Sequence, residues 1–153
     1  MPRKVWIKVK GTQASAPGEY AGDVELLTEG MYRRRNGMHY LTYDESEVTG
    51  MAGTTTTIKV TGGSVSIQRT GAINAQLQFE PGKSYSSRYE TGYGFISMNT
   101  HTNKVRVDIN ERSGGDISVE YCVEMDGTPC LDNKFDINFM FGTPTGKMLP
   151  ASN

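Results

Sequence analysis

Apolar and polar residues alternate with period two along most of the chain. In the first such run, Val5, Ile7 and Val9 alternate with lysines and Trp6. This alternation is typical of strands with one buried face, and no window of ten or more residues has the apolar period of a helix. Eleven runs follow the pattern, some of which can merge into one bent strand: 4–10, 23–35, 38–47, 54–60, 65–70, 73–79, 84–90, 93–100, 104–110, 117–124 and 135–141. The pattern predicts an all-β protein.

Turns rich in glycine separate these runs. Asn36-Gly37 is the strongest two-residue signal for a hairpin, because both residue types accept a positive φ. Gly62-Gly63, Gly71-Ala72 and Gly114-Gly115 mark further tight connections. Such turns describe an antiparallel meander, whereas a sandwich of Greek keys needs long connections between its sheets. We therefore expect residues 1–153 to form a single domain, an antiparallel up-and-down meander closed into a β-barrel of about 8–10 strands, with a sandwich as the less favoured alternative.

The more apolar face of each run is expected to face the interior, since apolar burial stabilises the fold by roughly 25 cal/mol per Å². This rule places all five phenylalanines inside. The predicted inward residues of the later runs are Val65, Ile67, Arg69, Ile73, Ala75, Leu77, Phe79, Phe95, Val105, Val107, Ile109, Ile117, Val119, Tyr121, Val123, Phe135, Ile137, Phe139 and Phe141. Trp6 lies on the lysine face of its run, and the pattern does not decide which face of that run is buried.

The run 23–35 changes phase near Glu29-Gly30. We interpret the change as a β-bulge, because one extra residue reverses the inward face beyond it. After this bulge, Arg33 would share an inward face with Met31. In the next run Tyr43 shares one with Leu41.

Polar residues in the apolar phase are the candidate binding residues. Arg69 continues the phase of Val65 and Ile67, and a buried guanidinium needs a carboxylate, several carbonyls or a bound anion. The candidate ligand-binding residues are Arg69, Tyr89, Tyr93, Tyr121, Arg33 and Tyr43. Structural alternatives stay open: an arginine at the barrel rim that reaches into water, tyrosines that serve only as core, and an arginine paired with an interior carboxylate such as Glu45.

The charge balance disfavours nucleic-acid binding. Lys and Arg total 16 against 17 Asp and Glu, so the formal net charge is −1 and the chain has no overall basic field. The basic run 32–35 sends its side chains to two faces, which predicts a solvated hairpin end. No stretch approaches the roughly 18–20 apolar residues of a membrane span, and the N-terminus lacks an apolar signal core. We expect no nucleic-acid partner, no membrane partner and a cytoplasmic location.

Cysteine and histidine are too few for a zinc site. The chain has two of each, Cys122, Cys130, His39 and His101. Glu45 shares a face with His39, but strand spacing separates the two residues by about 20 Å, so we reject a metal or acid–base site there. Reduced thiols are the simpler interpretation in an unexported protein, with a disulfide as the alternative. No metal and no cofactor is predicted.

Several short motifs of the chain are characteristic in combination. They are Tyr40-Leu41-Thr42-Tyr43-Asp44-Glu45, Gly53 followed by TTTTIKV at 54–60, Arg69-Thr70-Gly71, Phe79-Glu80-Pro81-Gly82 and Tyr89-Glu90-Thr91-Gly92-Tyr93-Gly94. Their order and spacing resemble the DUF1934 or YwiB-like family of uncharacterised bacterial proteins across nearly the whole chain. The resemblance implies a cytoplasmic protein with a calycin (lipocalin-like) barrel of eight to ten strands. It implies no activity, ligand or catalytic residue.

Two functions from different classes fit these observations. The first is a binding module that takes a small ligand with an acidic group in the barrel, because barrels of about eight strands can hold one small molecule. The second is a structural or protein-interaction barrel with a filled interior that acts through its outer surface, with a homodimer as one form. The sequence contains neither a phosphate loop nor a nucleophile elbow, so no catalytic residue is predicted and an enzyme is the less favoured class.

Overall fold

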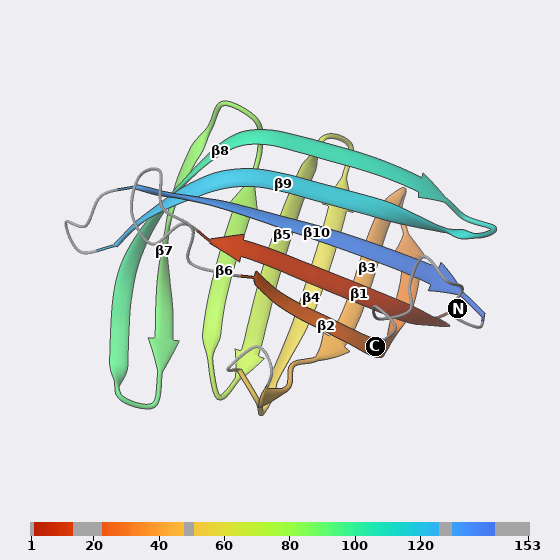
Figure 1. Ribbon diagram of the computed structural model, residues 1–153, viewed down its shortest axis with the longest axis horizontal. Helices are drawn as coiled ribbons and strands as arrows, with labels where there is room; N and C mark the ends of the chain where they lie inside the picture. The colour runs from red at the N-terminus through yellow and green to blue at the C-terminus, as the bar shows by residue number, and fades with distance from the viewer. Residues whose placement is uncertain (1, 14–22, 48–50, 126–129, 143–153) are drawn as a thin grey trace.

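The computed structural model describes residues 2–13, 23–47, 51–125 and 130–142. These residues form the strands that the alternation predicts (Figure 1). The strands are β1 (Arg3–Gln13), β2 (Asp23–Arg35), β3 (Met38–Asp44), β4 (Thr54–Thr61), β5 (Ser64–Gly71), β6 (Asn74–Phe79), β7 (Ser84–Thr91), β8 (Gly94–Asn110), β9 (Gly114–Met125) and β10 (Leu131–Phe141). The all-β prediction is confirmed.

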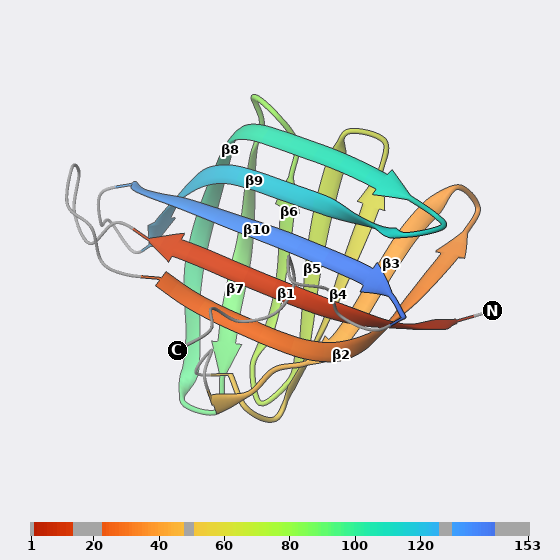
Figure 2. The same ribbon diagram turned by 45° about the vertical axis from the view of Figure 1, so that its right-hand side comes forward.

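The ten strands form one closed antiparallel barrel. Each strand pairs with its neighbour in the chain, and β1 closes the sheet by pairing with β10. In Figures 1 and 2 the strands β1, β2, β9 and β10 cross β3–β7 at a wide angle, so the barrel has two layers joined at corners. The predicted meander is confirmed, and the sandwich is excluded by the closure.

The first corner lies in β2 at Gly30. The bulge expected at Glu29-Gly30 is wrong, because the β1–β2 register continues unbroken from Thr12↔Asp23 to Arg3↔Tyr32. A Cβ added at Gly30 would lie 2.5 Å from Ile7 Cδ1 and 2.6 Å from the Thr42 carbonyl oxygen. Glycine therefore permits the close approach of β1 and β3 at this bend.

The absence of a bulge reverses the faces predicted beyond Gly30. Tyr32, not Arg33, lies in the interior, with only 3% of its surface exposed. Met31 is 43% exposed and Arg33 is exposed, so their inward assignment is wrong. The sequence appeared to change phase because the inward positions in this part of β2 carry Thr28 and Gly30 instead of large apolar residues.

The second corner lies in β8, which merges two of the predicted runs. Its register with β9 shifts between Thr102 and Lys104, and the strand bends from one layer into the other (Figure 1). The inward residues accordingly change from even numbers, such as Met98 and Thr100, to odd numbers, such as Val105. A bulge does reverse which residues face the interior, but it lies in β8 and not in β2.

The hairpin predicted at Asn36-Gly37 is confirmed. The φ angles are 52° at Asn36 and 77° at Gly37, as a two-residue turn of type I′ requires. This turn joins β2 to β3 directly.

The core occupies the barrel interior. Its buried members are Val5, Ile7, Leu26, Tyr32, Leu41, Tyr43, Ile58, Val60, Val65, Ile67, Leu77, Phe79, Met98, Ile117, Val119, Phe135, Ile137 and Phe139. Phe79 packs edge-on against Phe135 with ring centroids 5.3 Å apart, and Tyr32 stacks on Phe139 at 5.6 Å. Trp6 is half-buried on the outer face, since its neighbours Val5 and Ile7 are fully buried.

The inward assignment of Phe95 is wrong. The turn between β7 and β8 places Ile96 opposite Tyr89 and Phe95 opposite Glu90, so Phe95 is on the outer face. Phe95 is 55% exposed and lies under the Arg88 guanidinium, 4.3 Å from the ring centroid. The alternation of inward and outward residues does not continue through a turn. The inward phase of Tyr89 on β7 therefore does not predict the face of Phe95 on β8.

The two cysteines form a disulfide, Cys122–Cys130. The expectation of reduced thiols is therefore wrong. The β9–β10 register, with Leu131 opposite Val123, brings the two Cα atoms to 5.4 Å, which is within the usual range for a disulfide. Within the described residues, no helical segment is long and apolar enough to cross a membrane.

The assignment of Phe139 to the inner face and Phe95 to the outer face can be tested by replacing each with alanine. We expect Phe139→Ala to lower the free energy of unfolding by about 3–5 kcal/mol, because it empties a buried site. Phe95→Ala removes an exposed ring and should change it by less than about 1 kcal/mol. Urea denaturation of the two variants measures both values, and equal midpoints would contradict the assigned faces.

The β2 corner makes a second prediction. Gly30→Ala should destabilise the protein by about 1–3 kcal/mol, because its methyl group overlaps Ile7 and the Thr42 carbonyl. Gly11→Ala is the matched control, since a Cβ at Gly11 meets no atom within 4 Å. The control should be neutral or slightly stabilising through the lower entropy of the unfolded chain. Thermal unfolding of both variants measures the two changes in stability. Similar losses in both would show that no close approach exists at Gly30.

Candidate functional site

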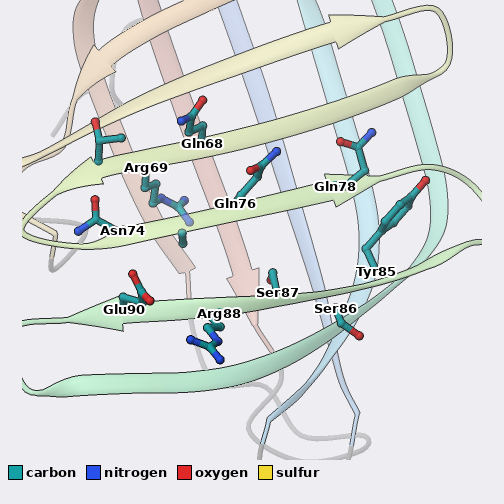
Figure 3. Close-up of a pocket in the computed structure, with 12 residues that line it drawn as sticks. Gln68, Arg69, Asn74, Gln76, Gln78, Tyr85, Ser86, Ser87, Arg88 and Glu90 are labelled. Carbon is teal, nitrogen blue, oxygen red and sulfur yellow. The ribbon is translucent and has the colours of Figure 1, made fainter.

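The wall of the barrel is split between β6 and β7. The register between these strands pairs only Asn74 with Glu90 and Ala75 with Tyr89. On its other side β6 stays paired with β5 as far as Val65↔Phe79. Figure 3 shows β6 and β7 diverging beyond the paired residues, and a cleft of about 640 Å³ lies there.

The connection from β6 to β7 holds the split open. After Pro81, the Gly82 N–H donates to the Thr102 carbonyl oxygen at 2.9 Å, and the Thr102 N–H donates to the Lys83 carbonyl oxygen at 3.1 Å. Thr102 is at the bulged corner of β8. The start of β7 is therefore tied to β8, while β6 follows β5, and the two strands separate.

Two polar side chains that line this cleft each have a buried atom without a hydrogen-bond partner. The Arg69 side chain is 17% exposed, and its Nε has no hydrogen bond. The Ser87 Oγ is also buried without a hydrogen-bond partner. The outer rim is polar as well, with Gln68, Gln76 and Arg88 along it (Figure 3). Unpartnered buried polar groups are rare in folded proteins, so they mark this cleft as a candidate site.

Arg69 is held by a carboxylate within the barrel. The cross-strand row Tyr43↔Thr56↔Arg69 places the three side chains on one inner face of β3, β4 and β5. Glu45 follows β3 in the same phase, and its side chain is 1% exposed. The Arg69 Nε lies 3.8 Å from Glu45 Oε2, and the Thr56 hydroxyl donates to that oxygen at 2.5 Å. The Thr56 hydroxyl thus satisfies Oε2 and Arg69 adds an ion pair without a hydrogen bond, while Glu45 Oε1 has no hydrogen-bond partner.

Tyr43 and Tyr121, which lie near this pair, stay protonated. Burial raises the pKa of Tyr43 well above its usual value, and the neighbouring Glu45 raises it further. Burial also raises the pKa of Tyr121, although the positive charge of Arg69 lowers it somewhat. The positive charge of Arg69 lowers the pKa of Tyr43 as well. The ring of Tyr121 packs edge-on against Phe79 at 4.8 Å, so its apolar part belongs to the core.

The structure brings together four of the six residues proposed from the sequence. Arg69, Tyr43 and Tyr121 surround one interior region, and Tyr89 is next to it through the row Arg69↔Ala75↔Tyr89. The other two lie elsewhere. Tyr93 is fully exposed in the β7–β8 turn, and Arg33 is exposed with its guanidinium 5.1 Å from the Tyr40 ring centroid.

Sequence reasoning missed Ser87 and the buried threonines Thr100 and Thr102. The hydroxyl groups of both threonines are buried without hydrogen-bond partners, as in Ser87. Ser87 precedes Tyr89 by two residues and so has the same phase. That phase was the available signal, but a small hydroxyl side chain does not distinguish an inner face from an outer one.

Ser84, His101 and Glu124 form a chain on the outer face of β7, β8 and β9. The Ser84 hydroxyl is hydrogen-bonded to His101 Nδ1, and His101 Nε2 lies 3.5 Å from Glu124 Oε2. The nearby N–H groups of Gly82 and Lys83 already donate to carbonyl oxygens. These two N–H groups are therefore not free to stabilise an oxyanion beside Ser84.

A metal site does not form among the described residues. No group of three or more His, Cys, Asp or Glu side chains gathers there in a way that could hold a metal ion. His39 interacts instead with Tyr32, whose hydroxyl is 2.7 Å from His39 Nδ1.

Comparison with known proteins identifies the family. The model of the family described as "Domain of unknown function (DUF1934)" matches residues 7–137. The chain belongs to the DUF1934 family. The uncharacterized beta-barrel protein YwiB of Bacillus subtilis (strain 168) is 31% identical over 98 residues, which are 64% of this chain and 67% of YwiB. The crystal structure of the ywiB protein from Bacillus subtilis matches with a TM-score of 0.80 at 25% identity, over 93% of this chain and 94% of that chain.

These DUF1934 relatives confirm the predicted family resemblance and the barrel. Their names give no activity, substrate or ligand.

The Arg69–Glu45 pair makes a third prediction. Arg69→Met should lower the free energy of unfolding by about 3 kcal/mol, because it leaves the Glu45 carboxylate buried without its cation. The partial exposure of Arg69 sets this value at the low end for a buried pair. The double variant Arg69→Met/Glu45→Met should recover the loss, since apolar side chains replace both charges. Chemical denaturation of the wild type, both single variants and the double variant measures the coupling, and additive effects would contradict a paired role.

Proposed function

We propose that this DUF1934 protein is a binding module that holds a small, uncharged polar molecule in the cleft between β6 and β7. The observation that carries the proposal is the coincidence of the split wall with buried side chains that lack hydrogen-bond partners. A ligand seated there would satisfy those groups, whereas a purely structural wall would be expected to continue the ladder between the two strands.

The chemistry of the cleft favours a ligand with both donors and acceptors. Arg69 Nε offers a donor, and the Ser87 hydroxyl can both donate and accept. The rim amides of Gln68 and Gln76 add groups of both kinds. A polyol or an amide matches this mixture of groups.

The charge balance argues against the acidic ligand that the sequence favoured. The positive charge of Arg69 is already next to Glu45, which is almost completely buried. On the rim of the cleft, Arg88 is balanced by Glu90. An anion would have to compete with Glu45 for Arg69, and an uncharged ligand would not.

The aromatic packing inside the barrel supports a ligand position in the wall of the barrel and not at its centre. Phe79, Tyr121 and Phe135 contact one another edge-on with ring centroids 4.8 to 5.8 Å apart. Phe79 and Phe135 belong to the core, and Tyr121 packs against it. The polar groups that we assign to binding lie beside the gap between β6 and β7.

The cytoplasm is the proposed location, supported by the family resemblance. The disulfide Cys122–Cys130 opposes this part of the proposal, because disulfides persist mainly in oxidising compartments.

A protein-interaction barrel is the second candidate, and it is favoured by one surface. The β7–β8 hairpin exposes Tyr93, Phe95 and Ile96, with Tyr93 fully exposed and Phe95 55% exposed. Exposed apolar side chains gathered on one hairpin are common in interfaces. Self-association measured by sedimentation equilibrium, and lost in Phe95→Ser, would support this candidate.

The binding function makes a fourth prediction, which can be tested with glycerol, glucose and acetamide as probes. Saturation-transfer NMR should detect binding of at least one probe to the wild type. Ser87→Ala should weaken that binding about tenfold, because it removes one well-placed hydrogen bond. Ser97→Ala is the matched control, since Ser97 is exposed on β8 outside the cleft.

Two results would overturn the binding function. The first is that none of the three probes binds saturably and that native mass spectrometry of protein from its own host shows no retained molecule that binds saturably. The other is equal binding by the Ser87 and Ser97 variants.

A further inference from the structure

A second concave surface lies at one end of the barrel, between the β2–β3 hairpin and the β8–β9 hairpin. The two hairpins lie near each other at the right-hand end of the barrel in Figures 1 and 2. The pocket between them has a volume of about 590 Å³ and is lined by Arg34, His39, Ile109, Asn110, Glu111 and Arg112. It has no lining residue in common with the cleft between β6 and β7.

The position of His39 in this pocket is fixed by a buried tyrosine. His39 is opposite Arg34 in the β2–β3 register. The hydroxyl of the buried Tyr32 lies 2.7 Å from His39 Nδ1, and the Tyr32 ring packs on Phe139 and Phe141. Because Nδ1 is engaged by Tyr32, Nε2 is the ring nitrogen left to meet a ligand.

The positive charges of the pocket outnumber the negative ones. Arg34 Nη1 lies 2.6 Å from Glu111 Oε1, and Arg3 Nη1 donates to the Glu111 carbonyl oxygen at 2.8 Å. The Arg3 guanidinium lies 3.5 Å from the centroid of the Phe141 ring, which fixes its position. The Arg112 N–H donates to Asn110 Oδ1 at 2.8 Å, and this hydrogen bond orders the turn that carries Arg112. Two arginines, Arg34 and Arg112, thus line the pocket with one carboxylate, that of Glu111, and the Arg3 guanidinium contacts the Glu111 backbone.

We propose that this pocket binds a small oxyanion of the phosphate type, held by Arg34, Arg112 and His39. Guanidinium groups match the planar, paired acceptors of phosphate and carboxylate groups, and two of them on facing hairpins can contact one anion from two sides. Glu111 shares Arg34 and competes with the anion for it. The affinity for a single anion is therefore modest, in the millimolar range of weak surface sites.

The two histidines of the chain provide a direct readout. Burial lowers the pKa of His39, and the positive charge of Arg34 lowers it further, whereas Glu111 raises it. An anion bound beside His39 opposes these effects and raises the pKa, because an opposite charge stabilises the imidazolium. His101 is on β8 beside Ser84 and Glu124, outside this pocket, and serves as the internal control.

The test is a titration of the two histidine ring signals by NMR at constant ionic strength. Inorganic phosphate, phenyl phosphate and chloride are the three additives. We expect phosphate to raise the pKa of His39 saturably and to leave the chemical shifts of the His101 ring unchanged, with no effect of chloride. Phenyl phosphate distinguishes two possible sources of the phosphate group. If it binds as tightly as inorganic phosphate, the ligand is free phosphate. If it binds more tightly, the ligand is a phosphate monoester whose organic part contacts Ile109.

Three variants complete the experiment. Arg34→Gln and Arg112→Gln should each weaken phosphate binding about tenfold. Arg106→Gln should not, since Arg106 is exposed on β8 and does not line the pocket. All three positions are exposed, and unchanged melting temperatures would exclude unfolding as the cause. Equal responses of both histidines to phosphate and chloride, or unchanged binding in Arg112→Gln, would overturn the proposal.

Discussion

The pairing of β1 with β10 is the constraint on which the rest of the structure depends. A sheet of ten strands that closes on itself has no free outer edge, but it must turn corners to do so. Closure around a core of side chains leaves little room, so the corners occur where the backbone can bend. Gly30 provides one bend through the absence of a side chain, and the register shift at Thr102 provides the other through an extra residue.

The split between β6 and β7 follows from the same constraint. The corner in β8 draws the start of β7 with it, through the two hydrogen bonds between Thr102 and the residues Gly82 and Lys83. On the other side, β6 remains in register with β5. The two strands that diverge are thus each well anchored elsewhere. The cleft is a fixed part of the wall, and its polar lining is presented by strands that the rest of the barrel holds in place.

The sequence was informative where local chemistry determines local structure. Period-two alternation and the Asn36-Gly37 turn were sufficient for the strands, the meander and one hairpin. Interactions between distant strands were beyond its reach. Gly30 looked like a change of phase because its role depends on Ile7 and Thr42, and Phe95 looked buried because a turn reversed the phase between it and Tyr89. The same reason hid the cleft, whose existence depends on how β6 and β7 diverge, and the disulfide, which depends on the β9–β10 register.

The interior of the barrel has an apolar part and a polar part. One part of the interior contains aromatic and aliphatic side chains in close contact, which is what stability requires. Another part contains Glu45, Arg69 and buried threonine hydroxyls, some of them without partners. A buried ion pair contributes little more to stability than apolar residues of the same volume, and unpartnered hydroxyls reduce stability. Stability alone therefore does not account for the polar region, which borders the split wall at Arg69.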